Sequence, residues 1–235
     1  MVTVPQTSID LPEYLRLHRF STADYLQMIE KGVLGPHDKV ELIHGLIVEK
    51  NEPDISPHRF STADYVEMIE KGILGPDDHV ELIGGVIVEM SPAGIPHNGF
   101  LMTMVELLAP LVGKYKIAIQ GTLNVSEGQV YDPDVMLLRR RADGYKSNLP
   151  ESPDVLLIIE AAESSLPHDQ KVKLPVYAAA GIPEYWIADL EREAFIIHRD
   201  PEGANYRTIQ IRQGDDVVSP SAAPELSFAV RQAFE

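Results

Sequence analysis

Two acidic residues lie at the ends of apolar segments in the middle of the chain. Asp134 follows Pro133 at the start of one segment, and Glu160 ends the apolar run 155–159. If these segments are neighbouring strands, both carboxylates meet at one edge of a sheet and bind a hard divalent cation, Mg²⁺ or Mn²⁺, which prefers oxygen ligands. The alternative is that both acids end their strands in solvent without a ligand, and spacing alone favours this alternative.

Arginines offer a second kind of chemistry. Arg139, Arg140 and Arg141 form the one basic cluster, directly after the segment that begins at Asp134. They could hold a phosphate backbone near the predicted cation, or they could form a solvated, charged strand edge. The formal net charge of −16 favours the second interpretation, because nonspecific affinity for nucleic acids comes largely from Lys and Arg.

The elements that must position these residues alternate between helix and strand. Apolar spacing predicts a helix over 97–115, which Pro110 shortens or kinks, and another over 169–180, which Gly181 ends. Such interleaving with strands is typical of an α/β or α+β domain with a mixed sheet. The predicted strands are 116–120, 130–138, 155–160 and 184–189, with a closing hairpin over 195–198 and 206–211.

A tandem duplication precedes these elements. Residues 18–50 and 58–90 align without gaps at an offset of 40, and 25 of the 33 positions are identical. Each copy predicts a helix capped by a serine, followed by a β-hairpin with a two-residue turn. Because a solenoid needs at least about three repeats, two copies indicate an appendage to a domain.

The composition excludes several classes of protein. The chain has 235 residues, 44% of them hydrophobic, which is enough for a sizeable core. The absence of cysteine excludes disulfides, thiolate zinc sites and cysteine nucleophiles. The longest apolar window, 100–112, contains Glu106 and Pro110, and the N-terminus has no basic-then-apolar signal. We therefore expect a soluble, cytoplasmic protein without a membrane partner.

Several motifs together resemble one known family. They include the Pro133-Asp134 pair, the segment 160–166 (EAAESSL) and the segment 169–186 (DQKVKLPVYAAAGIPEYW). Upstream, the segment 81–92 (ELIGGVIVEMSP) and His97 extend the match, which covers roughly Phe60 to the C-terminus. In this combination the chain resembles the Uma2 family of restriction endonucleases, also called DUF820.

The resemblance implies a PD-(D/E)XK nuclease fold, a restriction-endonuclease-like mixed β-sheet flanked by helices, with Asp134 and Glu160 as metal ligands. The general nuclease pattern has a lysine two residues after the second acid, where this chain has Ala162. The Uma2 pattern has its lysine on the following helix, and Lys173 matches it. Lys173 would activate the attacking water or stabilise the phosphate. Asp169, four residues earlier, would orient this lysine or form only a solvated ion pair with it.

Three further residues are weaker candidates for supporting roles at the same site. Glu81 matches an acid of the family pattern, but its copy Glu41 lies in a repeat without the rest of the domain, which equally favours a structural role in the hairpin. Gln120 matches a family position. His97, near the start of a predicted helix, could face the site, although a lone histidine is more often a core or surface residue.

These inferences predict a metal-dependent endonuclease that hydrolyses phosphodiester bonds of nucleic acid, with DNA as the first expectation, Mg²⁺ or Mn²⁺ as cofactor and a homodimer as the assembly. Residues 58–235, including the second copy, would form the nuclease domain, and residues 1–57 an appendage that contains the first copy. We expect the first copy to be dispensable for the fold, because the polar linker 51–54 follows it. The alternative is a catalytically inactive nuclease fold that acts as a binding or interaction module.

Overall fold

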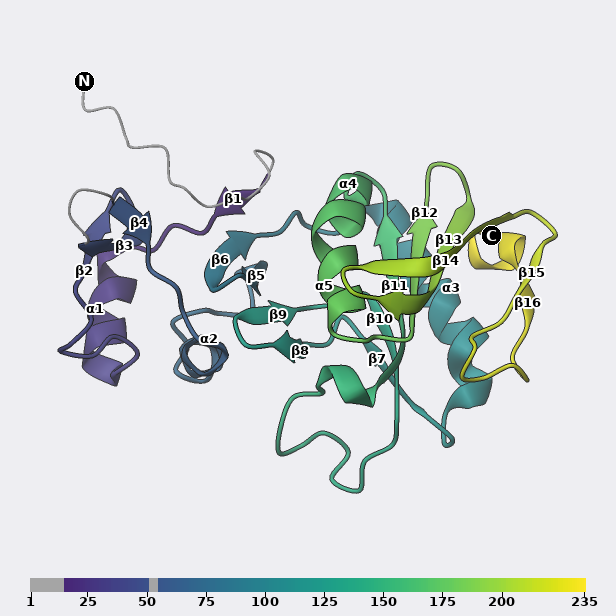
Figure 1. Cartoon of the computed structure of the whole chain (residues 1–235), viewed down its shortest axis with the longest axis horizontal. Helices are drawn as coiled ribbons and strands as arrows, with labels where there is room; N and C mark the ends of the chain where they lie inside the picture. Colours follow the sequence, from purple (N-terminus) through teal and green to yellow (C-terminus); the bar gives the residue numbers. More distant parts are fainter. Residues whose placement is uncertain (1–14, 51–54) are drawn as a thin grey trace. The chain divides into compact units, whose positions relative to one another are not determined.

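The computed structural model describes residues 15–50 and 55–235, so the linker predicted at 51–54 lies outside the described residues. The chain forms two compact units, each with its own core (Figure 1). Of the described residues, the first unit comprises 15–50, 55–92 and Glu127–Val130, and the second comprises Ala93–Ser126 and Tyr131–Glu235. Both copies of the repeat belong to the first unit.

Both predicted repeat helices are present and capped as expected. Helix α1 spans Thr22–Lys31, and helix α2 spans Thr62–Glu70. Their N-caps are Ser21 and Ser61, and each cap serine forms a capping box with the aspartate three residues further on. Gly32 ends the first helix in the left-handed conformation, with a φ of 83°, which glycine adopts without steric cost.

Each copy continues into the predicted hairpin. Strand β2 (Val40–Ile43) pairs with β3 (Leu46–Lys50), and β5 (Val80–Ile83) pairs with β6 (Val86–Glu89). The two turn residues have φ of 50° and 83° in the first hairpin, and of 58° and 80° in the second. Positive φ at both central positions is what a type I′ turn requires, and its twist matches that of the flanking strands.

Two short strands, β1 (Arg16–Leu17) and β4 (Ile55–Pro57), precede the repeat helices, where the sequence pattern predicts none. Strand β1 pairs with β6, and β4 pairs with β3. Two residues of β9 (Gln129–Tyr131) pair with β5, at Leu82 with Val130 and Ile83 with Gln129. This pairing joins residues 127–130 to the first unit.

The second unit is built on a six-stranded mixed sheet with the strand order β14-β13-β12-β11-β10-β7. Strand β11 runs parallel to β12, and the other neighbouring pairs are antiparallel. The predicted mixed sheet is therefore confirmed. Its strands are β7 Lys116–Ile119, β10 Val135–Leu138, β11 Val155–Ala162, β12 Glu184–Asp189, β13 Ala194–Glu202 and β14 Asn205–Gln213.

One predicted strand is divided in two. The sequence pattern predicts a continuous strand over 130–138, but β9 ends at Tyr131 and β10 begins at Val135. Pro133 lies between them, and proline has no N–H to donate to a neighbouring strand. Asp134 therefore lies immediately before β10 and not inside a strand.

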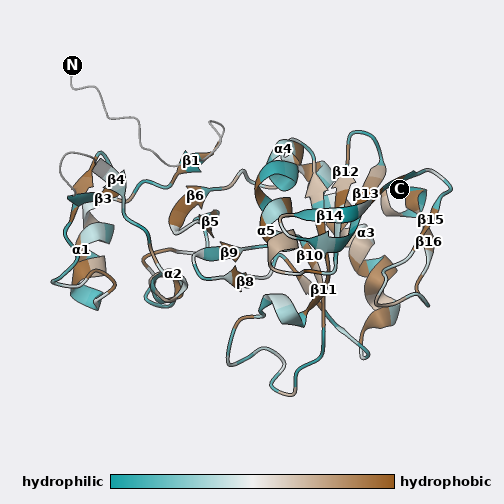
Figure 2. Ribbon diagram, viewed as in Figure 1, coloured by the Kyte–Doolittle hydropathy of each residue, from teal (hydrophilic) through white to brown (hydrophobic). Residues whose placement is uncertain are grey.

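Helix α3 (Ile95–Leu108) covers one face of this sheet, and α5 (Leu174–Ala179) lies on the other (Figure 1). As predicted, α3 ends before Pro110, where a 3₁₀ turn follows. Hydrophobic residues line α3 and the central strands (Figure 2). Trp186 belongs to the core beneath α3, whereas Tyr177 of α5 packs edge-on against Tyr185 with ring centroids 5.1 Å apart. No helix in the described ranges is long and apolar enough to cross a membrane.

The helix predicted over 169–180 begins three residues earlier, at Leu166, and consists of three parts. Helix α4 (Leu166–His168) leads into a π-helical turn over Asp169–Lys173, and α5 follows. Pro175 gives a physical reason for the wider turn, because its ring crowds the carbonyl four residues earlier and it has no N–H to donate. Leu174 N accordingly donates to Asp169 O, five residues back.

The remaining elements complete the second unit. Strand β15 (Val217–Val218) pairs with β16 (Phe228–Ala229), and the following 3₁₀ turn contributes Val230 and Ala233, both fully buried, to the core under α3. The other short elements are β8 Leu123–Ser126 and 3₁₀ turns at Ala109–Leu111, Ser152–Asp154 and Val230–Ala233.

Phe195→Ala should lower the free energy of unfolding by about 3–5 kcal/mol, because it leaves a cavity in a filled aromatic cluster. The Phe195 side chain is fully buried, and its ring lies 5.2 Å from that of Trp186. Urea unfolding followed by circular dichroism measures the change. Ile209→Ala is the control, since Ile209 is 60% exposed on β14 and should change stability by less than about 0.5 kcal/mol. Equal effects of the two variants would contradict the described core.

Candidate active site

Asp134 and Glu160 lie beside each other where β10 begins and β11 approaches its end. The antiparallel register pairs Val135 with Ile159, so Asp134 and Glu160 are the next positions along the ladder. Asp134 N donates to Glu160 Oε2 at 3.3 Å, and Ala161 N donates to Asp134 Oδ2 at 2.9 Å. Only 8% of Asp134 and 2% of Glu160 is exposed. The alternative that both acids end their strands in solvent is therefore wrong.

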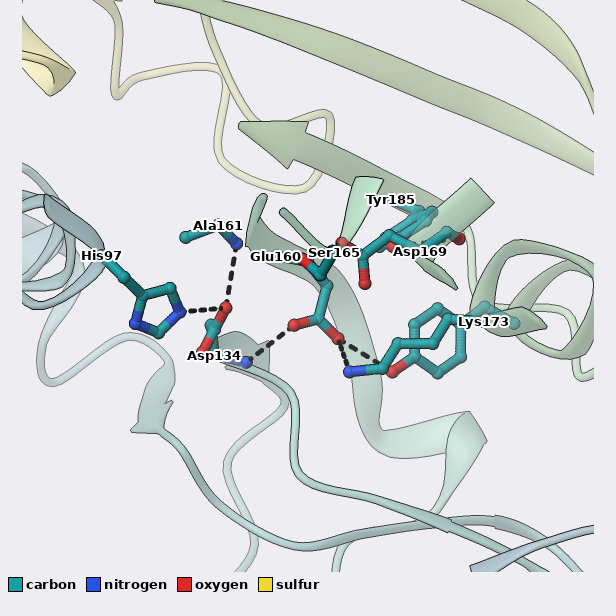
Figure 3. A network of polar contacts seen from close by, with 9 residues as sticks. His97, Asp134, Glu160, Ala161, Ser165, Asp169, Lys173 and Tyr185 are labelled. Atoms are coloured by element: carbon teal, nitrogen blue, oxygen red, sulfur yellow. Dashed lines mark hydrogen bonds and ion pairs between the residues drawn. The ribbon is translucent and has the colours of Figure 1, made fainter. Parts of the chain in front are cut away.

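Lys173 reaches Glu160 from the π-helical turn (Figure 3). Its Nζ lies 2.9 Å from Glu160 Oε1, and the hydroxyl of Tyr177 donates to the same oxygen at 3.1 Å. The ion pair is buried, because 5% of the lysine side chain and 3% of the glutamate side chain are exposed. Removing two charges from water costs several kcal/mol for each ion, so attraction and hydrogen bonds within the cluster must offset that cost.

Asp169 lies at the other end of the same turn. It is 2% exposed, and the hydroxyl of Ser165 donates to its Oδ2 at 2.8 Å. Burial raises the pKa of the Asp169 carboxyl above its usual value, against the opposing effects of Lys173 and of the Ser165 hydrogen bond. Asp169 and Lys173 therefore do not form a solvated ion pair, since both side chains are buried.

His97 contacts Asp134 from the first turn of α3 (Figure 3). Its Nε2 lies 2.8 Å from Asp134 Oδ2, and because a carboxylate oxygen only accepts, Nε2 carries the proton. The hydrogen bond to Asp134 raises the pKa of His97 above its ordinary value of 6.5, although burial acts in the opposite direction. Glu163 and Asp169 add smaller attractions that also favour the charged ring. The histidine thus faces the carboxylates, as one of the two sequence interpretations expected.

Gln120 is adjacent to this cluster through its backbone. Its N–H donates to Asp134 O at 2.9 Å, its φ is 47°, and its side chain is exposed. The structure therefore brings the backbone of Gln120, and not a buried amide side chain, to Asp134.

The three arginines lie at the opposite end of β10 from Asp134. Five residues of extended chain separate Asp134 from Arg139, which is about 16 Å. Arg139 Nε donates to Pro153 O at 3.2 Å, and Arg140 donates to Gly113 O at 2.8 Å. Arg141 pairs with Asp143 at 3.0 Å. The structure does not bring this cluster to the carboxylates.

Glu81 belongs to the first unit, on β5, where it is 2% exposed. Its copy Glu41 is half exposed and forms an ion pair with Lys50 at 2.6 Å. The position equivalent to Lys50 is Met90, so the surface ion pair of the first copy has no counterpart in the second. The two glutamates therefore differ in surroundings despite their near-identical sequence context.

Two donors at the site, Ser165 and the backbone N–H of Ala161, have no distinct signal of their own in the sequence. The backbone N–H of Ala161 donates to Asp134, and the hydroxyl of Ser165 donates to Asp169. Tyr177 has a partial signal, since four residues separate it from Lys173 and this spacing predicts packing against the lysine. The structure adds its hydrogen bond to Glu160, and the lysine also lies 6.0 Å from the ring centroid of Tyr131.

The comparisons with known proteins agree with this fold. The family model of Uma2, described as "Putative restriction endonuclease", matches residues 62–231, which is most of the chain. The chain belongs to the Uma2 family. Among curated proteins, no match to it is found.

A solved structure resembles the Uma2 protein in fold. It is a putative nuclease belonging to DUF820 from Anabaena variabilis ATCC 29413, with a TM-score of 0.56 and 16% sequence identity. The similarity covers 70% of this chain and 96% of the other. At this identity the likeness shows a shared fold, the mixed α+β architecture predicted from the sequence.

The carboxylates of the Uma2 site form a donor set that fits a hard divalent cation. The Asp134 carboxylate accepts its two described hydrogen bonds at Oδ2, and neither of them involves Oδ1. Mg²⁺ is commonly held by one or two carboxylates, with water and substrate phosphates as its other ligands. Among the described residues there is no preformed group of three or more acidic or histidine ligands, so the site fits such a two-carboxylate arrangement and not an all-protein cage.

Replacing His97 with Gln should reduce stability more at low pH than at high pH. The folded-state pKa of His97 is raised, so its contribution is fully present below the unfolded pKa of about 6.5. That contribution is lost as the pH rises through the folded-state pKa. Urea unfolding of both proteins in metal-free buffer should give a larger difference in unfolding free energy at pH 5.5 than at pH 9. An equal difference at both values would show that the imidazolium is not stabilised.

The Glu160–Lys173 pair predicts a strongly non-additive mutant cycle. Lys173→Met should cost about 3–5 kcal/mol of unfolding free energy, because it leaves Glu160 buried without its cation. Glu160→Gln should also destabilise, since it leaves the ammonium buried. The double variant should be less destabilised than the sum of the two, because neither charge remains. Chemical unfolding measures all four proteins, and additive losses would rule out a buried ion pair.

Proposed function

We propose that this Uma2 protein is a metal-dependent endonuclease that hydrolyses phosphodiester bonds of nucleic acid, with DNA as the first substrate. The observation that carries the proposal is the buried cluster of Asp134, Glu160 and Lys173 at one edge of the mixed sheet. Burying three charged groups is costly unless they serve one another or a ligand. Two carboxylates beside an ammonium suit metal-assisted hydrolysis of a phosphodiester.

Asp134 and Glu160 are the ligands we propose for Mg²⁺ or Mn²⁺. When bound there, the ion would act as a Lewis acid on the scissile phosphate and lower the pKa of the attacking water. Asp134 is oriented before any ligand arrives, because Ala161 N and His97 Nε2 both bind its Oδ2. His97 is therefore a positioning residue in this proposal.

Lys173 would supply positive charge to the reacting phosphate. Glu160 and the π-helical turn hold its ammonium at the edge of the sheet, so the charge need not be reoriented when negative charge develops in the transition state. Ala162, where the general nuclease pattern has lysine, is 2% exposed and buried at the end of β11. The helix lysine thus replaces a strand lysine by approaching the same carboxylate from another element.

Charge limits how the substrate could bind. The net charge of −16 opposes a broad electrostatic attraction to phosphate backbones. The arginine cluster 139–141 binds carbonyls and acids of its own unit, which makes it a poor backbone clamp. We therefore propose that binding depends on a metal at the carboxylates more than on surface arginines.

One observation favours a second candidate function, an inactive nuclease fold that binds a partner. Lys173 already neutralises Glu160, and the described residues contain no preformed ligand group of three. An ion pair of this kind can stabilise a fold without doing chemistry. Metal binding and cleavage measurements separate the two candidates.

The endonuclease proposal predicts cleavage of DNA or RNA with Mg²⁺ or Mn²⁺ but not with EDTA. Lys173→Met should lower the cleavage rate by at least about 10²-fold, since it removes an electrostatic interaction made in the transition state. The assay uses a temperature at which circular dichroism shows the variant folded. Lys171→Met is the matched control, because Lys171 is exposed on the same turn and should retain activity.

Calorimetry with Mn²⁺ completes the test. Replacing Asp134 with Asn and Glu160 with Gln should abolish Mn²⁺ binding and cleavage together, because amides are poor substitutes for anionic oxygen ligands. Mn²⁺ binding of unchanged affinity in the double variant would exclude Asp134 and Glu160 as the metal ligands. A folded protein that binds no Mn²⁺ and cleaves neither nucleic acid would favour the binding module.

A further inference from the structure

The two repeat copies exchange their leading strands. Strand β1, which precedes the first helix, pairs with β6 of the second copy at Arg16 with Glu89 and Leu17 with Val88. Strand β4, which precedes the second helix, pairs with β3 of the first copy at Ser56 with Glu49 and Pro57 with Val48. The copies are offset by 40 residues, so Ser56 and Pro57 are the equivalents of Arg16 and Leu17, and Glu49 and Val48 are the equivalents of Glu89 and Val88. Equivalent residues therefore pair in both registers. The exchange is thus reciprocal.

Hydrogen bonds and histidine–glutamate contacts between the copies repeat this reciprocity. His18 N donates to Ile87 O at 2.8 Å, and His58 N donates to Ile47 O at 2.8 Å. His18 Nδ1 lies 3.8 Å from Glu89, and His58 Nδ1 lies 3.4 Å from Glu49. At the helix ends, Lys31 Nζ donates to Lys71 O while Lys71 Nζ donates to Lys31 O. A two-fold axis generates such contacts in pairs, in which residue i contacts residue j and the equivalent of j contacts the equivalent of i.

The core of the first unit is also shared between the copies. Phe20 and Phe60, which are equivalent residues, lie with ring centroids 6.3 Å apart, as residues next to a two-fold axis do. Met28 and Met68 are fully buried in the same hydrophobic cluster. Each copy thus supplies one half of a symmetric interior, and separation of the copies would expose both halves to water.

We propose that the helix–hairpin unit is self-complementary. Within one chain, the first copy covers a surface of the second copy. The second copy of another chain can bind that same surface in place of the first copy. The contacting side chains permit this replacement, because the histidines, phenylalanines, lysines and glutamates at these contacts are the same residue types in both copies. In the resulting dimer, β4 of each chain would pair with β6 of the other. Ser56 would then lie opposite Glu89 of the second chain.

The absence of cysteine makes disulfide trapping in the full chain a direct test. Arg16→Cys with Glu89→Cys should form a disulfide within one chain, which denaturing gel electrophoresis without reductant shows as a single-chain band. Ser56→Cys with Glu89→Cys should stay reduced in the single chain, because Ser56 there pairs with Glu49. In this second variant, disulfide-linked dimers should accumulate as protein concentration rises and each chain's first copy is displaced.

Phe20→Asp should accelerate that exchange, because it places a charge beside Phe60 in the shared core. In the Ser56→Cys and Glu89→Cys background, disulfide-linked dimers should form at lower protein concentration, as measured by denaturing gel electrophoresis without reductant. Leu26→Asp is the matched control on α1, since Leu26 is 58% exposed and its substitution should leave the yield of linked dimers unchanged.

Two outcomes would overturn the proposal. One is the failure of the Arg16→Cys, Glu89→Cys chain to close its disulfide within a single folded chain. The other is the absence of linked dimers at every concentration in the Ser56→Cys, Glu89→Cys chain. This chain carries no core substitution, so its result tests the proposal even if the Phe20→Asp variant does not fold.

Discussion

The second unit depends on one electrostatic constraint, the burial of the Glu160 carboxylate at the end of an apolar strand. A buried carboxylate requires a cation and hydrogen-bond donors, and the ammonium of Lys173, the hydroxyl of Tyr177 and the backbone N–H of Asp134 all bind it. The π-helical turn delivers the lysine to this position. The same interaction that compensates the charge also concentrates the groups from which hydrolytic chemistry could be built.

The sheet and its helices set the precision of this cluster. Glu160 lies in β11 and Asp134 immediately precedes β10, so the register of these two antiparallel strands brings the carboxylates together. His97 approaches from α3 on one side, and Lys173 approaches from the helical segment on the other. Tight packing of Trp186 and Phe195 beneath α3 holds that helix in place. A polar site assembled from rigid elements is oriented before a ligand binds.

The first unit is stabilised differently, because two small and nearly identical copies share one core. Each helix–hairpin copy is too small to bury its apolar face alone, and the reciprocal exchange of β1 and β4 joins two copies around common aromatic and methionine side chains. The histidines, phenylalanines, lysines and glutamates at the contacts between the two halves are the same residue types in both copies. Duplication within one chain therefore keeps the two copies at a high local concentration, so that they can form the shared core without the association of two chains.

Local sequence determined the elements with strong short-range signals. The capping boxes at Ser21 and Ser61, the two-residue hairpin turns and the buried strand β11 follow from residue types a few positions apart, because their interactions are local. The family motifs singled out Asp134, Glu160 and Lys173 as candidates. Tertiary structure alone decided that Lys173 binds Glu160, that the arginine cluster lies away from Asp134, and that β1 and β4 cross between the copies. These outcomes depend on strand register and on contacts between distant segments, which no local pattern encodes.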